Sequence, residues 1–182
     1  RGAVYGDVLA NLLMFNGNTV IKEYYINDYG NQIINFTESV FLRLREIKFN
    51  EKFVNKENLY PGDYVIDIAK KILIESPEIN LANFEKIFSN LSEISLKHSM
   101  ILIKDDLKSL GISHDNFVSE KSIVKKNLVA KSIKYLQEKN YVEEGYLNPP
   151  KGEENKNWKK IKRLIFKSTL FGDDTDRALQ KN

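Results

Sequence analysis

EYYINDYGNQ, at residues 23–32, is the most informative segment of this 182-residue chain for its fold. Its aromatic and apolar half is typical of a buried strand, which we expect to cover residues 19–26, and it stops at a cluster of polar side chains and a glycine. Residues 3–15, before it, repeat apolar side chains at helical spacing and are followed by Gly17 as a helix stop. A helix, a strand and a polar turn that opens another helix is how an α/β sheet builds a ligand site at its strand ends.

Helical periodicity dominates the middle of the chain. It predicts helices over three segments, the last of them as one helix or two: residues 30–47, 64–75 and 81–110. Asp63 is placed to cap the second helix, Pro77 to end it, and Gly111 to close the third. Since charged residues and asparagines break the pattern after residue 47, we predict a mostly helical insertion over residues 48–110.

The strand pattern returns after this insertion. Short strands are expected over three segments: residues 114–119, 141–147 and 164–169. Ser119 or Ser122 is positioned to cap a helix that runs to Lys139. The chain is thus predicted to be α/β, in three parts: a first core segment at residues 1–47, the helical insertion at residues 48–110, and a return to the core with short strands and a charged loop at residues 111–182.

Bulk composition excludes several classes of protein. The chain has no cysteine, which excludes a disulfide framework and a cysteine-based zinc site. No apolar run approaches ~18 residues, so no transmembrane helix is expected, and the first residues do not form a signal peptide. We therefore predict a cytoplasmic protein that makes no membrane contact. The net charge of +3 permits RNA contact without arguing for it, and Arg1 in place of a methionine predicts a segment of a longer protein.

The polar cluster at the end of the first strand has two interpretations. A carboxylate from Asp28 and amides from Asn27 and Gln32 are suited to binding a guanidinium, a ribose or an ammonium group. Alternatively, Asp28 caps the helix that starts at Gly30, which is the commoner role of an aspartate before a helix. Spacing alone leaves both interpretations open.

The order of these segments also carries a family resemblance. RGAVYGDVLANLL at residues 1–13, followed by residues 23–32, resembles the catalytic domain of bacterial arginyl-tRNA synthetase. Two further parts of the chain resemble the same family. One is DLKSLGI at residues 106–112 followed by DNFVSE at residues 115–120, and the other is FGDDTDR at residues 171–177. The resemblance implies part of a Rossmann-like class I synthetase catalytic domain.

In that family, arginine and ATP form arginyl-adenylate, and the arginyl group then passes to tRNA(Arg). The resemblance therefore implies an arginine–tRNA ligase with L-arginine, ATP and tRNA(Arg) as partners and with Mg²⁺ accompanying the ATP. It implies that Asp28, Gly30 and Gln32, together with Asn27, lie near the arginine and ATP sites. In the first helix, Tyr5 and Asp7 are expected to face or support that pocket, and the amino end near Gly2 to point at phosphate. These roles rest on the resemblance rather than on spacing.

The catalytic motifs of the family are absent from the sequence. There is no His-Ile-Gly-His tetrapeptide and no Lys-Met-Ser-Lys-Ser loop, so we assign no catalytic residue. His98 and His114 do not match the first motif and do not form a metal site, so no protein-bound metal is expected. The chain by itself is therefore predicted to be inactive. The family strand that carries the first motif is also missing, which predicts an open, apolar sheet edge and a chain that is poorly soluble or self-associates.

Two other functions stay open at this point. One is a non-catalytic RNA-binding α/β module, in which a basic loop clamps single-stranded RNA: Lys156, Trp158, Lys159, Lys160, Lys162 and Arg163. Since Glu153 and Glu154 neutralise part of this charge, a solvated loop is the simpler interpretation. The other is a stand-alone α/β nucleotide-binding protein that is unrelated to synthetases.

Overall fold

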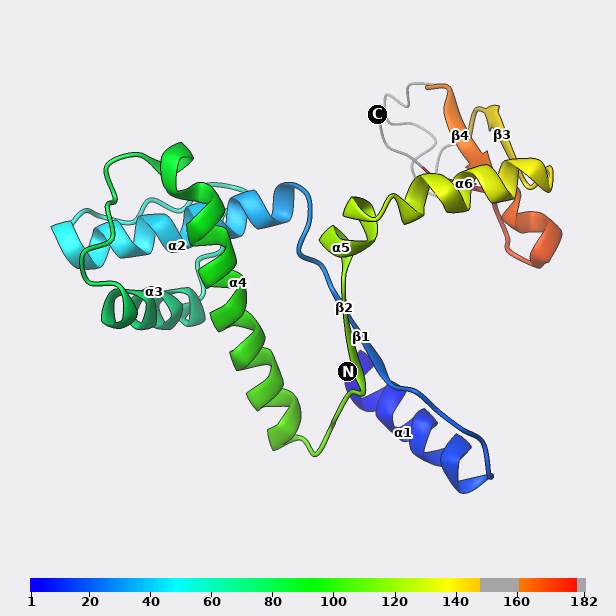
Figure 1. The fold of residues 1–182 in the computed structure, drawn as a ribbon, viewed down its shortest axis with the longest axis horizontal. Helices are drawn as coiled ribbons and strands as arrows, with labels where there is room; N and C mark the ends of the chain where they lie inside the picture. The colour runs from blue at the N-terminus through cyan, green and yellow to red at the C-terminus, as the bar shows by residue number, and fades with distance from the viewer. Residues whose placement is uncertain (148–160, 180–182) are drawn as a thin grey trace. The chain divides into compact units, whose positions relative to one another are not determined.

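The computed structural model describes residues 1–147 and 161–179, and the chain divides into one unit at Arg1–Ser122 and another at Ile123–Asn182 (Figure 1). The elements of the first unit are α1 (Gly2–Phe15), β1 (Glu23–Ile26), α2 (Asn31–Phe49), α3 (Asp63–Glu75), α4 (Phe84–Ser109) and β2 (Asn116–Ser119). Helix α5 (Glu120–Lys125) crosses the division. The second unit contains α6 (Leu128–Glu138), β3 (Val142–Gly145), β4 (Arg163–Phe166), the 3₁₀ helix η1 (Ser168–Phe171) and β5 (Arg177–Ala178). The α/β class is confirmed.

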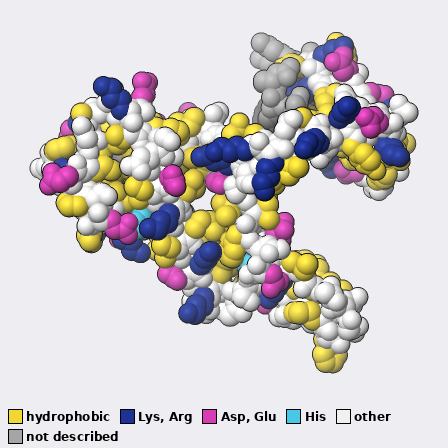
Figure 2. Space-filling view, in the orientation of Figure 1, with side chains coloured by type: hydrophobic (Ala, Val, Ile, Leu, Met, Phe, Trp, Pro, Cys, Tyr) yellow, Lys and Arg dark blue, Asp and Glu magenta, His cyan; other side chains and the backbone are white. Residues whose placement is uncertain are grey.

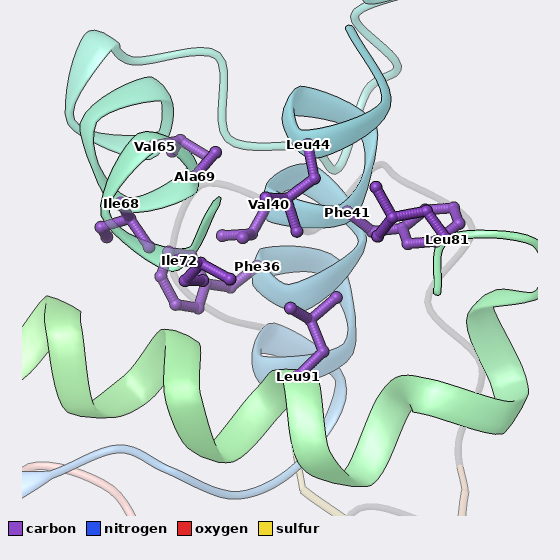
Figure 3. Close-up of a cluster of buried hydrophobic side chains, with 10 residues drawn as sticks. All are labelled: Phe36, Val40, Phe41, Leu44, Val65, Ile68, Ala69, Ile72, Leu81 and Leu91. Atoms are coloured by element: carbon purple, nitrogen blue, oxygen red, sulfur yellow. The ribbon is translucent and has the colours of Figure 1, made fainter. Parts of the chain in front are cut away.

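Helices α2, α3 and α4 enclose the core of the first unit (Figure 3). Helix α2 contributes Phe36, Val40 and Leu44, which recur at four-residue spacing and so lie on one helical face. Ten buried side chains make up the cluster: Phe36, Val40, Phe41, Leu44, Val65, Ile68, Ala69, Ile72, Leu81 and Leu91. Helix α2 shares this core with α3 and α4, so the three-helix core begins at Asn31. The three-part division of the chain stays a prediction.

The ends of these helices differ in part from expectation. The turn before α3 has Gly62 at the N-cap, and Asp63 is the first helical residue, so the predicted capping bond from Asp63 was wrong. At that position, its carboxylate still has a favourable interaction with the positive end of the helix. Helix α4 is a single helix, capped by the Asn83 side chain at its start and followed by Gly111 with a φ of +73°. That left-handed conformation is why glycine ends it.

Strands β1 and β2 form a parallel pair in which Glu23 lies opposite Asn116 and Ile26 opposite Ser119. A parallel pair requires a long crossover connection, and α2 to α4 provide it. The ladder starts at Glu23 instead of residue 19. Just before it, the Lys22 amide donates to the Asp115 carboxylate (2.7 Å) and the Lys22 carbonyl accepts from the Asn116 amide (3.2 Å). The carboxyl ends of both strands therefore lie at the same end of the pair.

The helix predicted to run from Ser119 to Lys139 is interrupted. Ser119 Oγ accepts a hydrogen bond from the Ser122 amide at 3.0 Å, which confirms it as a helix cap. Helix α5 ends at Lys125, however, and α6 begins after Asn127, whose φ is +55°. Asparagine tolerates this left-handed conformation, so it divides the predicted helix into two.

The second unit is built on the antiparallel order β3–β4–β5. Ion pairs of 2.5 Å join neighbouring strands at Lys162–Glu144 and Lys167–Glu143. The last expected strand stops at Phe166, because the chain turns into η1 and stacks Phe171 on Phe166 with ring centroids 5.6 Å apart. Of the predicted basic loop, Lys156, Trp158, Lys159 and Lys160 lie outside the described residues, whereas Lys162 pairs with Glu144 and Arg163 begins β4. Across the two described ranges, no helix combines the length and apolar character that a membrane crossing needs.

Candidate functional site

Asp28 joins the carboxyl ends of the two parallel strands. One carboxylate oxygen accepts a hydrogen bond from Ser119 Oγ at 2.7 Å, and the other accepts one from the Lys121 amide at 2.9 Å. Asp28 therefore caps α5 across the strand pair. It does not cap α2, the helix that follows it in sequence. Gly30 is the N-cap residue of α2, and no side chain forms a capping hydrogen bond there. The capping interpretation was thus wrong about which helix is capped.

Gly30 lets the chain turn from β1 into α2. Its φ of +86° and ψ of −168° lie in a region that is essentially restricted to glycine. The turn brings the exposed side chains of Asn27 and Gln32 together, and Asn27 Nδ2 donates to Gln32 Oε1 at 2.6 Å. Four predicted site residues thus meet at one strand end: Asn27, Asp28, Gly30 and Gln32. Their contacts with ligands stay predictions.

A pocket of about 230 Å³ opens beside this cluster. It is lined by the Asn27–Gln32 amide pair, by aromatic rings from several elements and by part of α4. Its walls include Tyr25, Phe36, Tyr60, Tyr64, Ser99 and Met100. None of the described residues that line it carries a formal charge at neutral pH. The carboxylate of Asp28 is not part of the lining.

Two tyrosines of this pocket, Tyr64 and Tyr25, have raised pKa values. Desolvation raises the pKa of the Tyr64 phenol, and the nearby Tyr60 raises it further. Desolvation likewise raises the pKa of Tyr25, with the Glu120 carboxylate adding to the effect. Both phenols therefore remain hydrogen-bond donors at neutral pH. Chemically, the pocket offers flat apolar walls, neutral hydroxyls and two amides.

A second pocket, of about 450 Å³, is lined by α1, by β1 with the residues just before it, and by His114. Asp7 contributes to it and pairs with Lys22 at 2.9 Å, and this hydrogen bond lowers the pKa of the Asp7 carboxyl. Tyr5 does not line the pocket and is 73% exposed. His114 and Tyr24 also line it, with their rings in edge-to-face contact at 5.4 Å. Of the two α1 residues that were predicted to support a site, only Asp7 borders a described pocket.

Sequence reasoning missed several residues around the strand ends. Ser119 and Lys121 could have been found, because the predicted strands end at Ile26 and Ser119 and parallel pairing puts these ends together. Tyr60 and Tyr64 flank the predicted turn at Gly62, yet no local signal indicated that the turn folds back on β1. Such contacts depend on how α3 and α4 pack.

The described residues do not provide a metal site. Within residues 1–147 and 161–179, no three His, Cys, Asp or Glu side chains are placed to hold a metal ion. Asp28, just past the end of β1, already accepts two hydrogen bonds.

Comparison with known proteins identifies relatives over the whole chain. No protein-family model matches it. The chain is 52% identical over 183 residues to the arginine–tRNA ligase of Pelagibacter ubique and 47% identical over 183 residues to that of Ehrlichia chaffeensis. These alignments cover 100% of the chain and 32% and 31% of the relatives, so the chain spans about a third of their length.

A solved structure gives the same result at the level of the fold. A Campylobacter jejuni crystal structure described as a candidate arginyl-tRNA synthetase matches with a TM-score of 0.75 and 27% identity. The match covers 99% of this chain and 36% of the other. The resemblance drawn from the sequence is confirmed by both comparisons. Over its whole length, the chain is a homologue of about a third of an arginyl-tRNA synthetase.

Proposed function

We propose that this chain is part of the catalytic domain of an enzyme that activates L-arginine with ATP and transfers it to tRNA(Arg). The identity of 52% to the Pelagibacter ubique arginine–tRNA ligase over the full chain carries this proposal. The parallel β1–β2 pair with its helical crossover supports a Rossmann-like class I core. Action in the cytoplasm is part of the same proposal.

The proposed reaction has two steps. The carboxylate of arginine attacks the α-phosphorus of ATP, and pyrophosphate leaves with the electrons of the broken P–O bond. A terminal ribose hydroxyl of the tRNA then attacks the arginyl carbonyl, loses its proton, and AMP leaves. Neither step needs a covalent bond to the protein, so catalysis consists of positioning the reactants and stabilising charge at phosphorus.

In this proposal, the strand-end cluster is a positioning device. Asp28 fixes the end of β1 against Ser119 and the start of α5, and Gly30 sets the direction in which Asn27 and Gln32 project. These residues border the arginine and ATP sites, and Asp7 supports the neighbouring face of β1 through Lys22. Mg²⁺ would enter with the phosphates of ATP and help neutralise their charge.

A segment exchange tests the proposal. These 182 residues replace the matching segment of the Pelagibacter ubique arginine–tRNA ligase, and the chimaera is assayed for arginine-dependent ATP–pyrophosphate exchange and for arginylation, with tRNA(Arg) present. We expect both activities in the chimaera and no exchange from the 182-residue chain alone. A folded chimaera that binds RNA but does neither reaction would favour a non-catalytic RNA-binding module.

A further inference from the structure

The charge of the chain is divided unevenly between its two units. Residues 1–122 carry 14 Lys and Arg against 17 Asp and Glu, whereas residues 123–182 carry 14 Lys and Arg against 8 Asp and Glu. The mild net charge of +3 for the whole chain therefore combines an acidic first unit with a basic second unit. Positive charge concentrated in one part of a chain is typical of a protein that contacts an anionic polymer.

Exposed lysines line the second unit from the end of α5 to the end of α6. They form what we call the lysine surface: Lys125, Lys126, Lys131, Lys134 and Lys139. Figure 2 shows Lys and Arg side chains at the surface of the part that Figure 1 labels α6. Among the described residues, none of the five forms an ion pair, whereas both carboxylates of β3 pair with other lysines. The charge of the lysine surface is therefore available to an external anion.

The stability of α6 does not explain these lysines. Lys131 and Lys134 lie one helical turn apart, and like charges at this spacing repel each other. No acidic side chain occupies the first turn of α6, where a carboxylate would stabilise the helix, and Glu138 is its one acidic residue. A negatively charged partner would relieve this repulsion.

Tyr135 adds an aromatic ring to the lysine surface. This residue is 59% exposed, and Lys139 Nζ lies 5.9 Å from the centroid of its ring. Lys131 and Lys139 are each one turn away from it, so all three side chains share one side of the helix. Ammonium groups beside an exposed ring suit a nucleic acid, because the lysines pair with phosphates and the ring stacks on an unpaired base.

From this distribution of charge and the exposed ring, we infer that the lysine surface of the second unit binds the sugar–phosphate backbone of tRNA. The inference rests on the proposed function for the identity of the RNA. Contacts to phosphate carry no sequence information, so this surface contributes affinity without distinguishing one tRNA from another.

An anionic membrane is a poorer partner for the same charge. A helix that lies on a membrane inserts a free apolar face among the lipids. Helix α6 packs against β3 instead, and the Tyr141 amide, next to that strand, donates to the Leu136 carbonyl at 2.9 Å. Ile133 and Leu136 are partly buried, so part of the apolar side of α6 is already used within the unit, while its lysines are exposed.

The salt dependence of binding tests the inference on the 182-residue chain, with a tRNA(Arg) transcript as the probe and fluorescence anisotropy as the measurement. Affinity should fall steeply as salt rises, because each neutralised phosphate releases a counterion. The double variant Lys131→Gln, Lys134→Gln should weaken binding and make the slope of log affinity against log salt shallower by about 2. Tyr135→Leu should weaken binding at least about fivefold and leave the slope unchanged.

The matched control is Lys70→Gln, Lys71→Gln, which removes two exposed lysines from α3 in the acidic first unit and should change neither affinity nor slope. A non-cognate tRNA should lose as much affinity for Lys131→Gln, Lys134→Gln as tRNA(Arg) does. The inference is overturned if the two double variants behave alike. It is also overturned if only vesicles of phosphatidylglycerol and phosphatidylcholine, and not tRNA, bind the α6 variant more weakly.

Activity of the chimaera separates this inference from the proposed function. In an active chimaera, Lys131→Gln, Lys134→Gln should raise the KM for tRNA(Arg) and leave the KM for ATP unchanged. An unchanged KM for tRNA(Arg) would count against the lysine surface. If the wild-type chimaera is inactive while the 182-residue chain still binds tRNA through these lysines, the proposed function is refuted and the inference about the lysine surface is kept.

Discussion

The helical core and the strand pair of the first unit are held together by different forces. Val40, Leu44 and Ile68 are fully buried among apolar neighbours in α2 and α3, and no polar bond is needed to keep them there. Strands β1 and β2 meet through their backbone ladder and the Tyr24–Phe117 ring contact, and their ends are joined by polar links such as Asp28 to Ser119 and Lys22 to Asp115. The core is thus stabilised by many apolar contacts, whereas the strand ends depend on individual hydrogen-bonding side chains.

Helix α1 shows what happens when apolar periodicity has no partner among the described residues. Figure 2 shows hydrophobic side chains along this helix at the surface, at the lower right of the view. Leu12 is 56% exposed and Phe15 is 89% exposed, while Ala10 is the one buried residue of the helix. Apolar spacing therefore predicted the helix but did not indicate whether its apolar face is buried.

The largest expected effect lies in the core. Leu44→Ala removes a fully buried side chain and leaves a cavity, so the free energy of unfolding should fall by about 2–5 kcal/mol. Leu12→Ala is the matched control, because its side chain is largely exposed, and it should change stability by less than about 0.5 kcal/mol. Urea unfolding followed by circular dichroism measures both. Equal losses of unfolding free energy in the two variants would contradict the contrast between the buried core and the exposed face of α1.

Gly30→Ala should produce the next largest effect, at the junction between the two regions. The φ of +86° and ψ of −168° strain any residue with a Cβ, so we expect a loss of about 1–3 kcal/mol. Space is not the reason, since nothing lies within 4 Å of a Cβ built there. Gly6→Ala, within α1, is the control and should not destabilise the chain. An equal loss of stability in both variants would contradict backbone strain at Gly30 as the cause.

Asp28→Ala tests the polar links at the strand ends. Loss of the cap on α5 should lower the free energy of unfolding by about 0.5–2 kcal/mol. Amide hydrogen exchange should quicken at Lys121 and Ser122, while the amides of α2 keep their protection. Asp67→Ala, on the exposed face of α3, serves as the control. Uniformly faster exchange in α2 as well would contradict the view that the strand ends and the core are held separately.

The smallest effect is expected from a surface carboxylate of the second unit. The hydrogen bonds from Arg177 hold the pKa of the Asp173 carboxyl below its ordinary value of 3.8. A carboxyl whose pKa is lower in the folded state stabilises the fold above pH ~4 and loses this contribution as the pH falls toward the folded-state value. Asp173→Asn should flatten this acid-side decline in the urea midpoint. An unchanged pH profile would show that the pair does not contribute, as many surface pairs do not.

Local patterns in the sequence predicted the elements well, because helix stops and strands depend on neighbouring residues. Gly17 and Gly111 both adopt positive φ where helix stops were expected, and β2 ends at Ser119 as predicted. The break at Asn127 was missed, because a left-handed asparagine inside an otherwise helical pattern gives no clear local signal. Asp63 was misplaced by one position, which is the usual uncertainty at a helix start.

Only the residues of the candidate site that directly follow β1 could be predicted from the sequence. Asn27, Asp28 and Gln32 could be singled out, because polar groups that follow a strand indicate a ligand site in an α/β sheet. Tyr60, Tyr64 and Ser99 could not, because their position depends on how α3 and α4 pack beside β1. The two hydrogen bonds of Asp28 likewise depend on a strand that follows much later in the chain.

The separation of Asp28 and Ser119 by 91 positions has a consequence for how the molecule assembles. Closing so long a loop costs conformational entropy, which the few hydrogen bonds of two short strands recover only when the intervening helices have already folded. During synthesis, α2 to α4 can collapse on Leu44 while β1 still has no neighbour and presents a bare edge. The strand-end site is then the last part of the first unit to form, once Ser119 has left the ribosome.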